Sequence, residues 1–134
     1  MKSICVIGSG ISGSTIANLL SKKYRVDVYE KAKGIGGRSS HRRYLNKLGF
    51  DHGLQYISPK TSKFKKFCSG LQKKRVLKKW QGPHKFNHSK VLENKKHTKL
   101  IGAKGNNAIS KYLLKNINCI FGYELFKIER IRKN

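Results

Sequence analysis

Acidic residues are scarce in this sequence, and their scarcity sets its overall character. Only 6 of the 134 residues are Asp or Glu, whereas 31 are Lys or Arg, so the formal net charge at pH 7 is +25. A basic excess of this size favours nucleic acid or an anionic membrane as a partner. Because 24 of the basic residues are Lys and 7 are Arg, bidentate reading of bases is disfavoured. A general compositional bias towards lysine explains the same excess.

Cysteine and long apolar runs are scarce as well. Cys5, Cys68 and Cys119 are far apart and form no Cys-x-x-Cys pair, which argues against a disulfide framework and fits a reducing cytosol. No apolar run approaches the roughly 18 residues of a membrane span, and Gly8 and Gly10 interrupt the early apolar run where a secretory signal would lie. We therefore expect a cytoplasmic protein with no membrane partner.

The first 30 residues have the pattern of a strand, a glycine turn, a helix and a second strand. The apolar run Ile4–Ile7 predicts a strand buried on both faces, and the turn Gly8-x-Gly10-x-x-Gly13 follows it directly. Residues 25–30 predict the second strand. This is the arrangement of a dinucleotide-binding unit, although a plain strand–helix–strand unit that binds nothing has the same outline.

Each glycine of this turn has a physical role in such a unit. Gly8 lets the chain turn sharply out of the strand, Gly10 leaves room for a pyrophosphate, and Gly13 lets the helix pack close to the strand. Ile11 and Ser12 begin the helix, whose free N–H groups direct a positive dipole end at the phosphates.

Glu30 ends the second predicted strand, at the distance from the glycines that the pattern requires. A carboxylate there accepts hydrogen bonds from the ribose hydroxyls of an adenosine. It would repel a 2′-phosphate, so NADP is disfavoured as the ligand.

A second glycine-rich turn, Gly34-x-Gly36-Gly37-Arg38, follows this acid almost at once. Its backbone N–H groups and the Arg38 guanidinium are suited to hold a second side of a pyrophosphate. Arg42 and Arg43 extend it into a local basic cluster.

Together these segments resemble the FAD-dependent amine oxidase superfamily and, within it, the renalase-like bacterial NAD(P)/FAD-dependent oxidoreductases. The resemblance covers almost the whole chain and is carried by Gly8-x-Gly10-x-x-Gly13, Glu30, Gly34-x-Gly36-Gly37-Arg38, Arg42-Arg43, Phe50-Asp51-His52-Gly53-x-Gln55-Tyr56, Trp80 and Leu100–Ile109. It implies an α/β fold: a Rossmann-type FAD-binding domain with a parallel sheet, plus an incomplete basic segment of a substrate domain.

The resemblance also implies the cofactor, the chemistry and the residues of the site. FAD would accept a hydride from a reduced small-molecule substrate, which remains unknown. The implied cofactor-binding residues are Gly8, Gly10, Ile11, Ser12, Gly13, Glu30, Lys31, Gly36, Gly37, Arg38, Gln55 and Tyr56. Gln55 and Tyr56 would lie near the flavin or the substrate. No residue is assigned as a catalytic acid or base, and His52 is interpreted as a structural hydrogen-bond partner.

Residues 59–99 form a segment of different composition. This segment contains fourteen Lys and Arg residues and a single acid, Glu93. The spacing of an amphipathic helix is seen in Phe64, Phe67, Cys68 and Leu71. Val76 and Leu77 predict the start of a strand. The basic face is interpreted as solvated; a surface that stacks bases and neutralises phosphates is the alternative. His84 and His88 are four residues apart, but no third ligand accompanies them, so we expect no metal site.

The last part of the chain predicts a return to the first domain. A helix over residues 108–117 would be capped by Asn106 or Asn107. The resemblance implies that a strand at residues 118–121 would lie parallel to the strand that ends at Glu30, and that Leu125 would begin another. The predicted domain limits are 1–58 for the FAD-binding region, 59–99 for the basic insertion, and 100–134 for the return.

Members of the family that the chain resembles continue well beyond this length. The resemblance therefore implies the N-terminal portion of an oxidoreductase: either a truncated reading frame, or one half of a split protein with a complementary chain as a partner that would supply the other half. Whether such a chain is an enzyme stays open, because most of the flavin's surroundings would lie outside it. A non-catalytic remnant that binds FAD or ADP is the first alternative, and a basic nucleic-acid-binding protein is a second, less favoured one.

Overall fold

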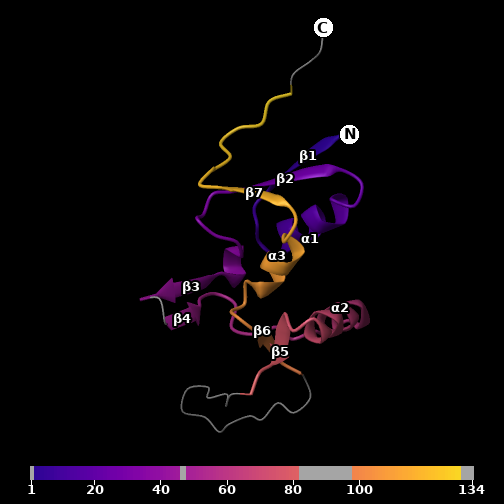
Figure 1. Ribbon diagram of the computed structural model, residues 1–134, viewed down its shortest axis with the longest axis vertical. Coiled ribbons are helices and arrows are strands. Elements are labelled where there is room, and N and C mark those ends of the chain that lie inside the picture. Colours follow the sequence, from indigo (N-terminus) through magenta and orange to yellow (C-terminus); the bar gives the residue numbers. More distant parts are fainter. Residues whose placement is uncertain (1, 46–47, 82–97, 131–134) are drawn as a thin grey trace. The chain divides into compact units, whose positions relative to one another are not determined.

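The computed structural model describes residues 2–45, 48–81 and 98–130 of the chain (Figure 1). Two compact units are formed, unit 1 from Met1–Gly37 and Ser110–Asn134 and unit 2 from Arg38–Ile109. The elements in chain order are β1 (Ser3–Ile7), α1 (Ile11–Leu20), β2 (Arg25–Glu30), the 3₁₀ turn η1 (Gly37–Ser39), β3 (His41–Tyr44), β4 (Leu48–Asp51), α2 (Ser62–Lys73), β5 (Leu77–Lys79), β6 (Leu100–Gly102), α3 (Ala108–Leu113) and β7 (Asn118–Phe121).

Unit 1 is built on a parallel sheet with the strand order β1-β2-β7. Val6 of β1 lies opposite Val28 of β2, and Glu30 at the end of β2 lies opposite Phe121 of β7. The predicted parallel pairing of residues 118–121 with the strand that ends at Glu30 is therefore confirmed. Numbered as strands 1, 2 and 3, these strands have the order 3-2-1, which is one half of the doubly wound Rossmann sheet. The fold class is thus α/β and Rossmann-like.

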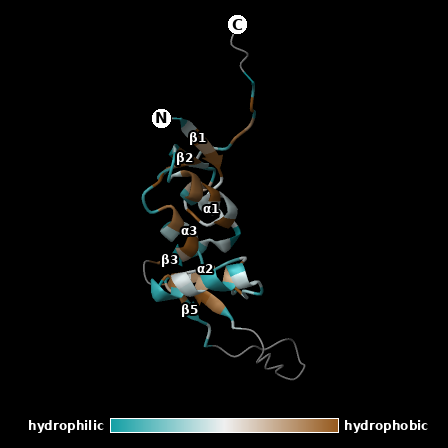
Figure 2. Ribbon diagram, turned by 90° about the vertical axis from the view of Figure 1, so that its right-hand side faces the viewer, coloured by the Kyte–Doolittle hydropathy of each residue, from teal (hydrophilic) through white to brown (hydrophobic). Residues whose placement is uncertain are grey.

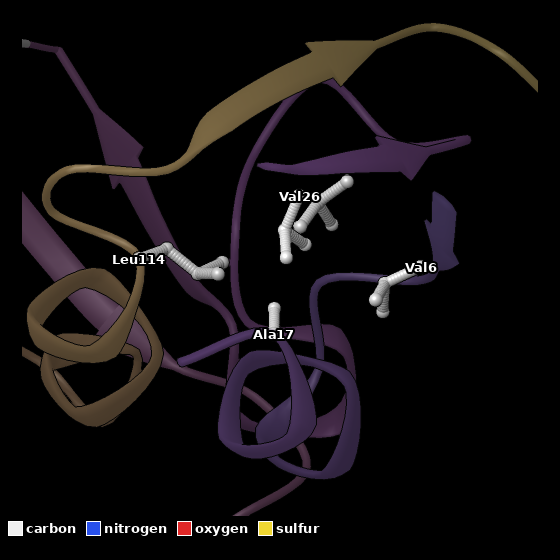
Figure 3. Packing of buried hydrophobic residues seen from close by; sticks show 5 residues of the cluster. Val6, Ala17, Val26 and Leu114 are labelled. Carbon is white, nitrogen blue, oxygen red and sulfur yellow. The ribbon is translucent and has the colours of Figure 1, made fainter. Parts of the chain in front are cut away.

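The core of unit 1 lies between one face of this sheet and helix α1, with Leu114 closing it after α3 (Figure 3). Ala17 on α1 is fully buried and points towards Val26 of β2. A methyl group at this position lets the helix approach the sheet closely, whereas a larger side chain would hold it away. Each valine that is buried here contributes about 1.5–3 kcal/mol of transfer free energy.

Strand β1 is not buried on both faces, contrary to the prediction from its apolar composition. Val6 is buried, but Cys5 on the other face is exposed and Ile7 is 49% exposed. Within the described residues, helix α1 covers one face of β1 and no strand pairs with its outer edge. An apolar run shows that a strand can be buried but does not show whether neighbours are present to bury it.

Unit 2 combines the amphipathic helix α2 with two antiparallel strand pairs, β3–β4 and β5–β6. The helix follows the predicted spacing, and Figure 2 shows hydrophilic and hydrophobic residues alternating along it. Cys68 and Leu71 are buried, whereas Phe64 and Phe67 are 38% and 36% exposed. The Thr61 hydroxyl accepts a hydrogen bond from the Phe64 N–H at 3.3 Å and begins the helix. The predicted strand after residue 76 is β5.

A network around Asp51 connects the β3–β4 pair to the loop before α3. One oxygen of Asp51, Oδ1, lies 2.9 Å from His41 Nδ1 and accepts the Asn106 N–H at 2.7 Å. The Asn106 amide donates to the Leu54 carbonyl at 2.6 Å, and its side-chain oxygen accepts the Gly102 N–H at 2.9 Å. Asn106 is fully buried, and its side chain holds two backbone segments of unit 2, one at Leu54 and one at Gly102.

Two predictions for the C-terminal part are wrong. Asn106 does not cap α3, because its side-chain oxygen accepts the Gly102 N–H instead, and within the described residues no helix N–H donates to the buried side-chain oxygen of Asn107. Leu125 does not begin a strand: residues 123–130 have no regular structure, and Phe126 is 91% exposed. Gly122, with φ of +79°, turns the chain out of the sheet directly after β7.

Candidate functional site

The turn after β1 has the geometry that two of its glycines were predicted to provide. Gly8 has φ of +91°, a conformation that favours glycine, and its N–H donates to the Tyr29 carbonyl at 2.7 Å. A Cβ atom on Gly13 would lie 1.9 Å from the Gly8 carbonyl oxygen and 3.6 Å from a methyl group of Val6. Helix α1 therefore packs against the turn and the strand at a distance that only glycine allows.

Gly10 is different, because the fold has room for a side chain there. The nearest atoms to a Cβ on Gly10 would be the Gly37 Cα at 3.9 Å and the Gly36 oxygen at 4.0 Å, which are ordinary contacts. The two glycine-rich turns lie side by side at this point, since Gly10 forms a parallel bridge with Gly36 and the Gly36 N–H donates to the Ser9 carbonyl at 3.2 Å. The requirement for glycine at position 10 thus does not come from the packing of the chain.

Helix α1 begins where these two glycine-rich turns lie side by side, and no side chain caps its N-terminus. The first helical hydrogen bond runs from the Ser14 N–H to the Gly10 carbonyl at 2.8 Å, and Gly10 as the N-cap residue makes no side-chain bond. Acidic residues are also absent from the first turn. The N–H groups of Ile11, Ser12 and Gly13 precede the first helical bond, and together with the helix dipole they favour an anion.

Glu30 brings a buried carboxylate to the same turn. It is 7% exposed, and its Oε2 accepts the Ser9 N–H at 2.8 Å and the Ser9 hydroxyl at 2.7 Å. The other oxygen, Oε1, accepts the Ala32 N–H at 2.9 Å. These bonds join the end of β2 to the turn that follows β1.

The same contacts keep this carboxylate ionised. Burial desolvates Glu30 and acts to raise its pKa, but the hydrogen bonds from Ala32 and Ser9, together with the positive charge of Lys31, outweigh burial and lower the pKa below its usual 4.5. Glu30 is therefore negatively charged at neutral pH. A fixed negative charge in this position suits hydroxyl donors and opposes a phosphate.

Lys31 follows Glu30 and lies at the surface of unit 1. Its ammonium group is 3.3 Å from Glu124 Oε1, and the two side chains are 71% and 54% exposed. An exposed pair of this kind stabilises a fold by about 0–1 kcal/mol. Lys31 can exchange this partner for a ligand phosphate at small cost.

Three of the predicted cofactor-binding residues lie in unit 2. The Arg38 side chain is exposed, and its carbonyl accepts the Leu54 N–H at 3.0 Å. Gln55 is exposed, and its carbonyl accepts from the Asn106 amide at 3.3 Å. The Tyr56 ring packs edge-on against Trp80, with centroids 6.2 Å apart, and Lys99 lies 4.5 Å above the Tyr56 ring. The structure brings the other nine predicted residues together in unit 1.

Two histidine interpretations have different outcomes. His52 is exposed and makes no hydrogen bond within the described residues, so its interpretation as a structural partner is wrong; His41 takes that role beside Asp51. His84 and His88 lie outside the described residues. Among residues that are described, no group of three His, Cys, Asp or Glu side chains could hold a metal ion.

Sequence reasoning missed Ser9 as a functional residue of this site. Its side chain is fully buried and donates to Glu30, yet the motif treats its position as any residue. The available signal was a hydroxyl between two required glycines, opposite an acid that closes the next strand.

A surface pocket of about 480 Å³ lies elsewhere in unit 1, between the end of α1 and residues 112–117. None of the predicted cofactor-binding residues lines it.

None of the helices that the described residues form has the length and apolar character to cross a membrane.

Residues 6–71 match the family model of an NAD(P)-binding Rossmann-like domain. This range begins in β1, includes both glycine turns and Glu30, and ends in α2. No curated protein matches the chain. The match supports a domain of the oxidoreductase type that binds a dinucleotide.

Proposed function

We propose that this chain binds FAD through the adenine nucleotide half of the cofactor and acts in an oxidoreductase of the amine-oxidase, renalase-like type. The proposal rests on one observation: the Glu30 carboxylate is hydrogen-bonded to the Gly8–Gly13 turn, from which α1 begins without a side-chain cap. An ionised acceptor for the ribose and N–H donors for the phosphates thereby lie on the same few residues. Glu30, Lys31 and the glycines would hold adenosine and pyrophosphate.

The second glycine turn supports FAD over a simple nicotinamide dinucleotide. Gly36 and Gly37 lie against Gly10, so backbone groups of both turns would border a pyrophosphate bound at the first turn. The family that the sequence resembles has this second turn after its ribose-binding acid. Arg38, Gln55 and Tyr56 would contact the remainder of the cofactor by the same resemblance.

When bound, the flavin would supply hydride acceptance from a reduced small-molecule substrate. The residues of this chain would orient the cofactor and hold its charged groups, and we assign no catalytic acid or base among the described residues. We also propose, from the sequence, that a complementary chain completes the flavin's surroundings and that the protein is cytoplasmic.

Cofactor titration of the purified chain tests this function. We expect FAD and NAD⁺ to bind, FAD more tightly, and NADP⁺ to bind at least about tenfold more weakly than NAD⁺ because its 2′-phosphate meets Glu30. A flavin spectrum that bleaches with an amine or a dihydronicotinamide would indicate an enzyme. Binding of FAD or ADP without bleaching would indicate the non-catalytic remnant. Absence of FAD binding would refute the proposal, whether or not NAD⁺ binds.

Binding of single-stranded nucleic acid is a second candidate, supported by the distribution of charge. Residues 38–109 carry 19 Lys and Arg against two acids, Asp51 and Glu93. Asp51 is hydrogen-bonded to His41 and Asn106, and the stacked rings of Phe64 and Phe67 are over one-third exposed beside the lysines of α2. Phosphates and bases suit such a surface. Affinity for a 12-nucleotide single strand that does not fall steeply with added salt would exclude this function.

A further inference from the structure

The two oxygens of the Glu30 carboxylate lie in different surroundings. Oε2 accepts two buried hydrogen bonds, from the Ser9 N–H and the Ser9 hydroxyl. Oε1 accepts one, from the Ala32 N–H, and this bond is only partly buried. Because a carboxylate oxygen offers about two acceptor positions, Oε2 is filled and Oε1 retains one. Oε1 is therefore the oxygen that can accept a hydroxyl of a ligand.

Ser9 is held firmly enough to set the direction of this carboxylate. It is fully buried, and its carbonyl accepts both the Gly36 N–H at 3.2 Å and the Ser14 hydroxyl at 3.0 Å. With its backbone fixed from two sides, Ser9 holds Oε2 by two short bonds. The carboxylate cannot rotate without breaking both of them.

We infer that Ser9 is a positioning residue for adenosine recognition, which fixes Glu30 so that Oε1 faces the ribose and its charge opposes a 2′-phosphate. This inference rests on the proposed function and deepens it. A free carboxylate could turn away from a 2′-phosphate and lessen the repulsion. A carboxylate that is anchored at Oε2 cannot, so Ser9 increases the preference for an unmodified ribose.

Few charged groups surround this arrangement. Lys31 follows Glu30 on the chain and is itself paired with Glu124, the first turn of α1 carries no charged residue, and β7 places Phe121 opposite Glu30. The Ser9 hydroxyl is one of the groups that lower the pKa of Glu30. Its removal should therefore raise that pKa towards the usual value.

A matched pair of variants separates positioning from packing. Ser9→Ala removes the hydroxyl that donates a hydrogen bond to Glu30, whereas Ser110→Ala removes an equally buried hydroxyl of unit 1 that takes no part in this arrangement. Calorimetric titrations of the full chain with ADP-ribose and with 2′-phospho-ADP-ribose measure the preference, since the two probes differ only in the 2′-phosphate. We expect Ser9→Ala to lower the ratio of the two affinities by about 3- to 10-fold, and Ser110→Ala to change it less than twofold.

Acid dependence gives a second readout that packing alone would not move. The pH at which ADP-ribose binding falls to half, and the carboxyl ¹³C titration of Glu30 measured without ligand, should both shift upward in Ser9→Ala and stay in place in Ser110→Ala. Should Ser9→Ala fail to fold, Ser9→Gly removes the same hydroxyl and keeps the N–H donor. Equal ratios and equal titrations in the two variants would overturn the inference alone, with the proposed function intact. No binding of ADP-ribose by the unmodified chain would overturn both.

Discussion

Unit 1 and unit 2 use their acidic residues and their glycines differently. In unit 1, Glu30 accepts three hydrogen bonds at the glycine turn, and Glu124 pairs with Lys31. In the described part of unit 2, Asp51 is the only acid, and it serves the hairpin and the loop before α3 rather than a lysine. The difference teaches that unit 1 is organised around a local sequence motif, whereas unit 2 is held by contacts between distant segments.

The glycines of the two helices give the largest contrast. A Cβ on Gly13 in α1 would lie 1.9 Å from a backbone oxygen, whereas a Cβ on Gly70 in α2 would meet nothing within 4 Å. We expect Gly13→Ala to destabilise the chain by about 3 kcal/mol or more, and Gly70→Ala to stabilise it by roughly 0.5–1 kcal/mol. Urea unfolding followed by circular dichroism measures both. Equal effects of the two changes would break the contrast between the units.

Asn106 should be the side chain on which unit 2 depends most. Its removal leaves the Gly102 N–H and the Leu54 carbonyl without their partner in a buried place. We expect Asn106→Ala to cost about 2–3 kcal/mol, and Asn116→Ala, an exposed asparagine of unit 1, to cost less than about 0.5 kcal/mol. Thermal unfolding of the two variants makes the comparison, and a loss below about 1 kcal/mol for Asn106→Ala would contradict the role of the network.

Glu30 should give unit 1 a dependence on acid. Because the pKa of Glu30 is lowered below 4.5 in the folded state, its contribution is fully present above pH 4.5 and is lost as the pH falls through the folded-state pKa. We expect Glu30→Gln to be about 1–3 kcal/mol less stable than the unmodified chain at pH 6, with the gap closing below pH 4. Unfolding curves between pH 3 and pH 7 measure the gap. A gap that is constant over this range would show that the Glu30 charge does not stabilise the fold.

Much of unit 1 could be predicted from the sequence because its signals are local. The turn at Gly8 and Gly13, the acid at Glu30 and the apolar strands are close together in the chain, and their geometry follows from backbone sterics. The exposure of Cys5 and Ile7 could not be predicted, because it depends on which neighbours cover the sheet. Ser9 was missed because its role lies in hydrogen bonds from its N–H and its hydroxyl to a residue 21 positions away.

Unit 2 was predicted less well for the same physical reason. The spacing of Cys68 and Leu71 identified α2, since helical periodicity is local. The β3–β4 pair gives no such pattern: Tyr44, Leu48 and Phe50 are all about half exposed or more, so no alternation marks a buried face. The contact of Asp51 with His41 and Asn106 depends on the folded chain, and sequence reasoning looked instead to the adjacent His52.

The most direct test of the central claim is the affinity of Gly10→Ala for FAD. The structure has room for a methyl group at Gly10, so the variant should unfold within about 0.5 kcal/mol of the unmodified chain. A pyrophosphate that approaches this backbone would meet the added methyl group, so we predict at least about tenfold weaker binding of FAD. Unchanged affinity in a normally stable Gly10→Ala would contradict the claim that this turn holds the cofactor.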